Sequence, residues 1–289
     1  MLEDGRPNFV KETEKIYKEF ESQINMIRQG TPMKPADINL SELIKSAYVK
    51  TYDFMMYLCQ LRDLKHAFFQ LPMLRGICED LITLSYIKNQ SIEIQNYILA
   101  KKRFDEMKKS SKAQKDFFDK YNPKQIIPPL INNTSFENIL SVYRNSGLVL
   151  QEATLPKVFE MAKLTGLADL YQFLYHATSK AVHFDIFTLL STGWGEIDRE
   201  NETLMPNFSY QHDYKHYFTF TFFYCSYLFI KQTKAFSPTL QLANVVNEVV
   251  DALENIYKDL DWPELITFHH LNIEPPPQEI RTTYRTGFK

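Results

Sequence analysis

The amino-acid sequence predicts an all-α protein, a bundle of about eight to ten helices with a small irregular or hairpin insertion near residues 192–209. Apolar residues recur at intervals of three and four along most of the chain, as on helices with one buried face. The 289 residues include only 8 glycines, fewer than an all-β fold or a phosphate-binding loop needs. Aromatic residues make up 14% of the chain, and we expect them to fill the space between helices.

The first predicted helix covers residues 8–29, with Pro7 ahead of it and Gly30 as its stop signal. Its apolar residues form one stripe, and its other faces are charged. Residues 31–39 contain two prolines and are predicted to be a linker. A second helix is predicted to follow as far as Arg62, with apolar residues almost all round its later turns, as in a central helix.

The next helix is predicted over residues 66–88, kinked at Pro72 or started by it. Ser91 is expected to cap a long, increasingly charged helix that reaches Tyr121. Its lysine-rich part, residues 101–120, is read as a solvated outer face or as a surface that contacts phosphates.

Two short helices are predicted at residues 135–143 and 155–164, the latter with Thr154 as its cap and Pro156 in its first turn. A further helix is expected over residues 167–184. Two long helices, 211–235 and 238–260, should close the core. The chain then divides into an N-terminal helix and linker (1–39), a helical core domain (40–265) and an extended C-terminal tail (266–289).

Charge, cysteines and hydropathy predict a cytoplasmic protein with no membrane partner. The net charge of −2 provides no overall attraction to nucleic acid or to anionic lipid. Cys59, Cys78 and Cys225 are far apart and odd in number, which favours buried thiols in a reducing compartment. The most apolar run, residues 217–230, is shorter than the about 20 residues that span a bilayer. The polar first ten residues predict no secretory signal.

No cofactor and no metal are predicted from the motifs. The chain has no nucleotide-binding glycine motif. His212 and His216 are four residues apart and can share a helical face, but no third ligand accompanies them.

A charged pair stands on the flank of an apolar helix, where Arg75 precedes Glu79 by four residues. This spacing is typical of an intrahelical salt bridge worth about 0.3 kcal/mol. A functional pair at the edge of the core is the alternative. Because buried charges need partners, we expect Arg75 to pair with Glu79 and to lie near the helix that carries Ser179 and His183. Removal of a buried pair of this kind should cost a few kcal/mol.

A polar stripe is predicted in residues 170–185, where Tyr171, Tyr175, Ser179 and His183 recur at every fourth position. Such a stripe on a helix with apolar neighbours has two readings. Either it belongs to a core helix whose hydroxyls and imidazole are satisfied by partners, or its aligned polar groups form a functional site.

These two segments carry a family resemblance. The combination of LPMLRGICEDLITLSYI with the later LPKVFEMAK and YQFLYHATSKAVHFD resembles an uncharacterised bacterial helical family of unknown function. That family has an Arg-x3-Glu helix and a Tyr-x3-Ser-x3-His helix, and is distantly similar to HEPN proteins, helical nucleases and RNA-binding modules of toxin–antitoxin and antiphage systems. The resemblance spans residues 46–187.

The resemblance implies a metal-independent endoribonuclease site, with His183 as base and Arg75 as phosphate ligand. The implied catalytic residues are His183, Arg75, Glu79 and Ser179, and the implied binding residues are Tyr171, Tyr175 and Lys180. Active HEPN ribonucleases carry an arginine four to six residues before the histidine, and this chain lacks one. The cation that binds the phosphate would then be either Arg75, from another helix, or Lys180.

Two functional hypotheses follow. The first is a HEPN-like helical protein of a bacterial defence or toxin system that cleaves or binds RNA. The second is a non-catalytic sensor, scaffold or small-ligand-binding module in which the polar stripe is structural. The expected partners are RNA, a protein encoded in the same operon, or a second copy of the chain.

Overall fold

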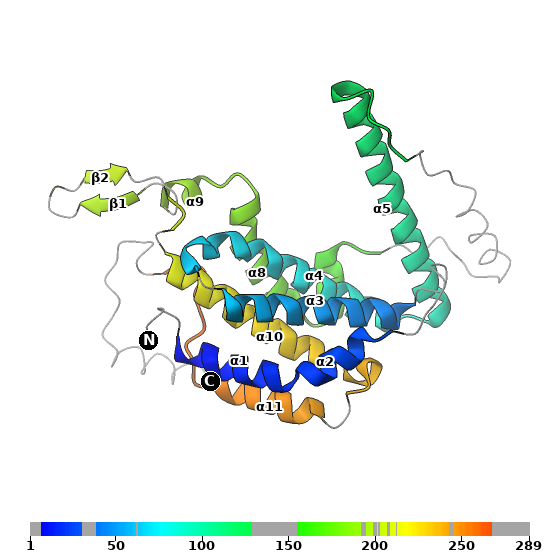
Figure 1. Ribbon diagram of the computed structural model, residues 1–289, viewed down its shortest axis with the longest axis horizontal. Helices are drawn as coiled ribbons and strands as arrows, with labels where there is room; N and C mark the ends of the chain where they lie inside the picture. The colour runs from blue at the N-terminus through cyan, green and yellow to red at the C-terminus, as the bar shows by residue number, and fades with distance from the viewer. Residues whose placement is uncertain are drawn as a thin grey trace.

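The computed structural model describes residues 7–30, 39–61, 63–128, 155–191, 195–198, 201, 203–206, 209–211, 213–242 and 245–267. These residues form an α-helical bundle with one small β-hairpin (Figure 1), which confirms the predicted fold class. In chain order the elements are α1 (Asn8–Glu19), α2 (Glu21–Arg28), α3 (Leu40–Gln60), the 3₁₀ helix η2 (Leu64–Gln70), α4 (Leu71–Lys88), α5 (Ile92–Tyr121), α7 (Val158–Leu164), α8 (Ala168–Val182), α9 (Ile186–Ser191), β1 (Gly195–Asp198), β2 (Thr203–Pro206), α10 (Tyr214–Leu240) and α11 (Val245–Tyr257).

Helix α10 is the centre of the core and packs against α3, η2, α4 and α11. Its aromatic residues are buried around most of its circumference, because other helices cover it on several sides. Phe229 lies at the centre of this aromatic core: its ring centroid is 4.9 Å from that of Tyr17 and 4.8 Å from that of Tyr48. In the described part of the chain, no helix has both the length and the apolar content needed to cross a membrane.

The N-terminal helices share this core. Val10, Tyr17 and Ile24 are buried, and α1 packs on α11 and α3. The single helix predicted over residues 8–29 is divided at Phe20, whose ring is buried against Phe229. The predicted linker lies almost entirely outside the described residues, and the three-part division of the chain stays a prediction.

Most helix ends in the first half follow local signals. Pro72 lies in the first turn of α4, directly after η2, as expected of a residue with a fixed φ and no amide proton. The Ser91 hydroxyl accepts a hydrogen bond from the Ile94 amide at 3.5 Å and caps α5, which ends at Tyr121 as predicted.

The start of α7 differs from the prediction. The helix begins at Val158, so Pro156 precedes it instead of lying in its first turn. The Glu160 carboxylate accepts a hydrogen bond from the Lys157 amide at 3.2 Å and sets this boundary. Thr154 and the helix predicted at residues 135–143 lie outside the described residues.

The predicted break near Pro238 is wrong, because α10 continues through this proline to Leu240. One backbone hydrogen bond is lost there, and the proline is two residues from the helix end, so little of the helix depends on that bond. The chain leaves α10 at Gln241, which has a left-handed φ of 56°. Helix α11 starts at Val245 rather than at residue 238.

The insertion predicted near residues 192–209 is a hairpin. Strand β1 pairs antiparallel with β2, with Gly195 opposite Pro206 and Asp198 opposite Thr203. Helices α8 and α9 precede it, and α8 lies against α4 (Figure 1), where it positions the candidate site.

Candidate functional site

The charged pair of α4 is formed. Arg75 Nε donates a hydrogen bond to Glu79 Oε1 at 2.8 Å, and the two side chains are 30% and 31% exposed. This hydrogen bond raises the pKa of Arg75 above its ordinary value, so the guanidinium stays charged. The pair therefore lies at the margin of the core, neither sealed inside it nor freely solvated.

Helix α8 meets this pair through its tyrosines. The Arg75 guanidinium carbon lies 4.7 Å from the centre of the Tyr175 ring, which confirms the predicted contact between Arg75 and this helix. The Tyr171 ring centroid is 5.7 Å from that of Tyr175. Burial raises the pKa of Tyr171, and the nearby Glu79 carboxylate raises it further. Arg75, Glu79, Tyr171 and Tyr175 form one group, which we call the α4–α8 cluster.

Helix α7 extends the cluster. The Phe159 ring lies 6.3 Å from that of Tyr171, and Lys163 Nζ lies 4.6 Å from the centre of the Phe159 ring. Phe159, Tyr171 and Tyr175 thus form an aromatic row with a cation at each end, Lys163 and Arg75. Sequence reasoning missed Phe159 and Lys163. Their spacing of four residues places them on one helical face, but only the packing of α7 on α8 brings that face to Tyr171.

Ser179 makes no described hydrogen bond with this row. Its hydroxyl is buried and makes no hydrogen bond within the described structure. The neighbouring Thr178 hydroxyl donates to the Leu174 carbonyl of its own helix at 2.7 Å. Neither hydroxyl makes a described hydrogen bond to Arg75, so the predicted role of Ser179 stays a prediction.

His183 does not continue the predicted stripe. Helix α8 ends at Val182, and His183 is exposed and extended, with φ −117° and ψ 161°. Its amide still donates to the Ser179 carbonyl at 2.9 Å. Tyr175, which Arg75 contacts, and His183 are eight residues apart, which corresponds to about 12 Å along a helix; no described contact joins Arg75 to His183.

Asp185 explains where α8 stops. Its carboxylate accepts a hydrogen bond from the Thr188 amide at 2.7 Å and starts α9, so the chain must leave α8 first. This hydrogen bond lowers the pKa of Asp185, and the positive charge of Lys180 lowers it further. Lys180 therefore lies near Asp185 at the C-terminal end of α8, close to His183 along the chain.

Comparison with known proteins finds one match, and it includes these helices. Residues 69–200 match a family of unknown function, DUF5677. The DUF5677 segment runs from the end of η2 past β1 and contains Arg75, Glu79 and the whole of α8. No curated protein and no solved structure matches the chain.

The DUF5677 match agrees with the predicted resemblance to an uncharacterised domain, while the likeness to HEPN proteins stays a prediction. The matched segment covers less than half of the chain. Helix α10, which packs against α4, lies outside it. No group of three or more potential metal ligands occurs among the described residues, and His212 lies outside them.

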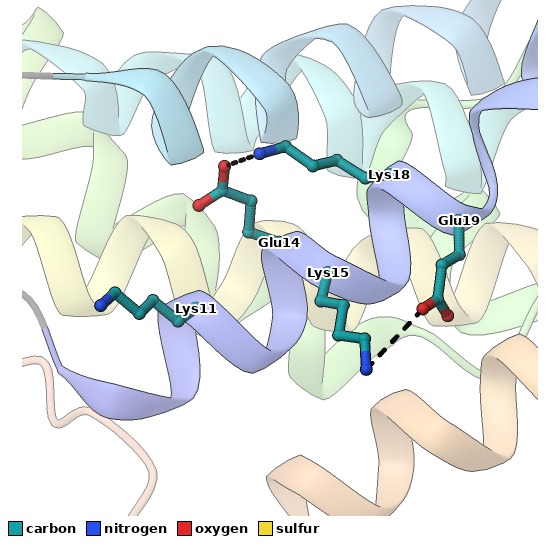
Figure 2. Close-up of a pocket in the computed structure, with 5 residues that line it drawn as sticks. All are labelled: Lys11, Glu14, Lys15, Lys18 and Glu19. Carbon is teal, nitrogen blue, oxygen red and sulfur yellow. Dashed lines mark ion pairs between the residues drawn. The ribbon is translucent and has the colours of Figure 1, made fainter.

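The surface depression in Figure 2 lies on α1, away from the DUF5677 segment. It is lined by Lys11, Glu14, Lys15, Lys18 and Glu19. Lys18 pairs with Glu14 at 2.6 Å and Lys15 approaches Glu19 at 3.9 Å, both along one helix. Such exposed pairs are typical of a solvated helix surface, so we place the candidate site at the α4–α8 cluster.

Replacing Arg75 with alanine is expected to lower the free energy of unfolding by about 1 kcal/mol. This is less than the few kcal/mol expected of a fully buried pair, because water reaches both side chains. A partly exposed ion pair and one guanidinium–ring contact each contribute about 0.5 kcal/mol. Urea denaturation followed by circular dichroism measures the change.

The matched control is Lys102→Ala, which removes a more exposed pair with Glu106 on α5 and should change stability by less than about 0.5 kcal/mol. Equal effects of the two substitutions would show that the contact between Arg75 and Tyr175 does not stabilise the fold.

Proposed function

We propose that this protein is an RNA-binding helical module, HEPN-like in architecture, that acts in a bacterial defence or toxin system and holds single-stranded RNA on the aromatic row. The observation that carries the proposal is the series of partly exposed rings, Phe159, Tyr171 and Tyr175, contributed by two helices. Single-stranded nucleic acids bind such rings by base stacking, which is worth about 1–3 kcal/mol per base.

The cations beside the rings suit the same ligand. Lys163 and Arg75 stand at opposite ends of the row, so a strand that stacks on the rings passes a positive charge at each end. Because the net charge of the chain is −2, the attraction must come from this local arrangement. Arg75 keeps Glu79 as its partner, which limits its share of that attraction.

Binding without cleavage is the form of the proposal that fits the site best. Cleavage through the RNA 2′-hydroxyl requires a base and a phosphate-binding cation near the same phosphate. His183 follows Tyr175, the ring that Arg75 contacts, by eight residues, which is about 12 Å along a helix, and Arg75 is already paired with Glu79. Cleavage is the second candidate, because His183 is exposed, as a base acting on RNA must be, and Lys180 precedes it by three residues.

Single-stranded RNA should bind the wild-type protein more tightly than duplex RNA of the same sequence, and Tyr175→Ala should weaken the single-strand affinity about tenfold or more. Fluorescence anisotropy with a labelled uridine-rich oligonucleotide measures both. Tyr57→Ala is the matched control, because Tyr57 is a partly exposed tyrosine on α3, outside the row. Lys163→Ala should reduce the slope of log affinity against log salt by about 1.

A denaturing gel of the same RNA separates binding from cleavage. Intact RNA after incubation is expected. Cut RNA that is lost in His183→Ala, while binding persists, would establish the cleavage candidate instead. If the wild-type protein fails to bind, or if Tyr175→Ala binds as tightly as wild type, the RNA proposal is wrong and the cluster serves a scaffold role.

A further inference from the structure

Helix α5 projects from the bundle. Its first turns hold the buried residues Tyr97 and Ile98, and its main contacts with other described helices are to α3 and α4. Figure 1 shows the rest of this 30-residue helix extending well beyond α3 and α4. A helix of this length that leaves its own core is unusual, since most helix stability comes from packing.

The projecting part carries a seam with coiled-coil spacing, in which three of the five side chains are large and mainly apolar. Met107, Ser111, Gln114, Phe118 and Tyr121 alternate at intervals of four and three residues, and we call these five residues the α5 seam. The same spacing begins earlier in the helix, with Tyr97, Ala100 and Phe104.

Large apolar side chains on and beside the seam are exposed to solvent: Met107 by 45%, Phe117 by 55% and Tyr121 by 64%. Large aromatic residues at neighbouring exposed positions of one helix are typical of an interaction surface. They indicate that the seam receives a further helix.

The charges beside the α5 seam determine which charges a partner helix needs in order to bind there. One flank carries Lys101, Lys108 and Lys115 at intervals of seven residues, and the other carries Arg103, Ser110 and Phe117. The acidic residues of α5 lie off both flanks, and two of them form ion pairs with flanking lysines, Asp105 with Lys101 and Asp119 with Lys115.

A second copy of α5 does not complement this surface. In a parallel pair, Arg103 of one helix would face Lys108 of the other, and in an antiparallel pair the lysine flanks would face each other. Either arrangement brings like charges together, whereas acidic residues on a partner helix would pair with these lysines, at Lys101 and Lys115 in exchange for Asp105 and Asp119.

We propose that the α5 seam binds an amphipathic helix of a partner protein, with leucine-like residues on its seam and glutamate or aspartate on its flanks, as a two-helix coiled coil over Met107–Tyr121. This surface is on α5 and does not depend on the proposed RNA-binding function of the α4–α8 cluster. The complex is expected to weaken as salt concentration rises, because the flanking charges are exposed.

The test uses two synthetic helical peptides of the same length with leucine at every seam position, one with glutamate and one with lysine on its flanks. Fluorescence anisotropy should show the acidic peptide binding the full chain at least about tenfold more tightly than the basic peptide. Phe118→Ala should weaken binding of the acidic peptide, because Phe118 is a large aromatic residue of the seam. Lys115→Glu should shift the preference toward the basic peptide.

Lys109→Glu is the matched control. It makes the same change of charge on the same helix, but position 109 faces away from the seam, so the preference for the acidic peptide should persist. Circular dichroism of each variant checks that α5 remains folded.

Four results would overturn the proposal. The first is equally weak binding of the two peptides. The second is dimerisation of the chain that Phe118→Ala abolishes, which would make a second copy the occupant. Binding of the acidic peptide only after deletion of residues 130–150 would make the chain's own segment the occupant. Loss of RNA affinity in Lys115→Glu, without any peptide binding, would assign α5 to nucleic acid.

Discussion

Replacing Phe229 with alanine is expected to lower the free energy of unfolding by about 3–5 kcal/mol. The Phe229 side chain is 0% exposed. Its ring contacts those of Tyr17, Phe20, Tyr48 and Tyr52, at centroid distances of 4.9, 6.1, 4.8 and 6.4 Å. These neighbours come from the N-terminal helices and from α3, so the truncation leaves a cavity where three parts of the chain meet, and large rings refill such a cavity poorly.

Urea denaturation followed by far-UV circular dichroism measures this loss. Phe184→Ala is the control of identical chemistry, because Phe184 is 83% exposed at the end of α8. It should change stability by no more than about 0.5 kcal/mol. A loss below about 1 kcal/mol for Phe229→Ala would contradict the placement of this ring at the centre of the core.

Alkaline unfolding between about pH 9 and pH 12 is the second large effect expected. Burial raises the pKa of the Cys78 thiol from an ordinary value of 9.0 to about 12. Burial also raises the pKa of Tyr17, Tyr48 and Cys225. Each of these groups is neutral when protonated, so the folded state retains protons that the unfolded chain releases.

The sign of the pH dependence follows from this difference in bound protons. Below pH 9 both states keep the Cys78 proton, and its contribution to stability is fully present. As pH rises from 9 toward 12, only the unfolded state loses that proton, and stability falls by about 1.4 kcal/mol per pH unit for each such group. The buried tyrosines add to the slope above their ordinary pKa of 10.0.

Unfolding free energies from urea titrations at several pH values in this window measure the slope, and tyrosinate absorbance reports ionisation. The absorbance of the buried tyrosines should rise in one cooperative step together with the loss of helical circular dichroism. Cys78→Ala should make the slope shallower by about 1.4 kcal/mol per pH unit between the ordinary pKa of 9.0 and the folded-state pKa of about 12. Ionisation of all tyrosines near pH 10, with the helical signal intact, would refute the burial of these rings.

The local parts of the fold were predictable because they depend on neighbours in the sequence. The Ser91 cap of α5, the position of Pro72 at the start of α4 and the hairpin between residues 195 and 206 each follow from residues within one turn or one strand pair. The Arg75–Glu79 pair was predictable for the same reason, since two residues four apart on a helix are always neighbours.

Competing local interactions explain where that reasoning failed. At the end of α8, the Asp185 cap of α9 outweighs the polar spacing that suggested a stripe as far as His183. At Pro238, the break expected from one lost hydrogen bond is outweighed by the packing of the surrounding turns, because Phe236 and Leu240 are both buried. Neither the end of α8 nor the continuation of α10 through Pro238 can be predicted from residue spacing alone, because both depend on how strongly the flanking residues pack.

The helical class, most helix positions and the charged pair on α4 could be predicted from the amino-acid sequence, because hydrophobic periodicity and contacts one turn apart are properties of a single segment. Tertiary structure alone decided that Arg75 lies on Tyr175, that Phe159 joins Tyr171 and that α5 leaves the bundle. These relations join helices far apart in the chain, and the angle and register of helix packing are set by the shapes of both surfaces at once.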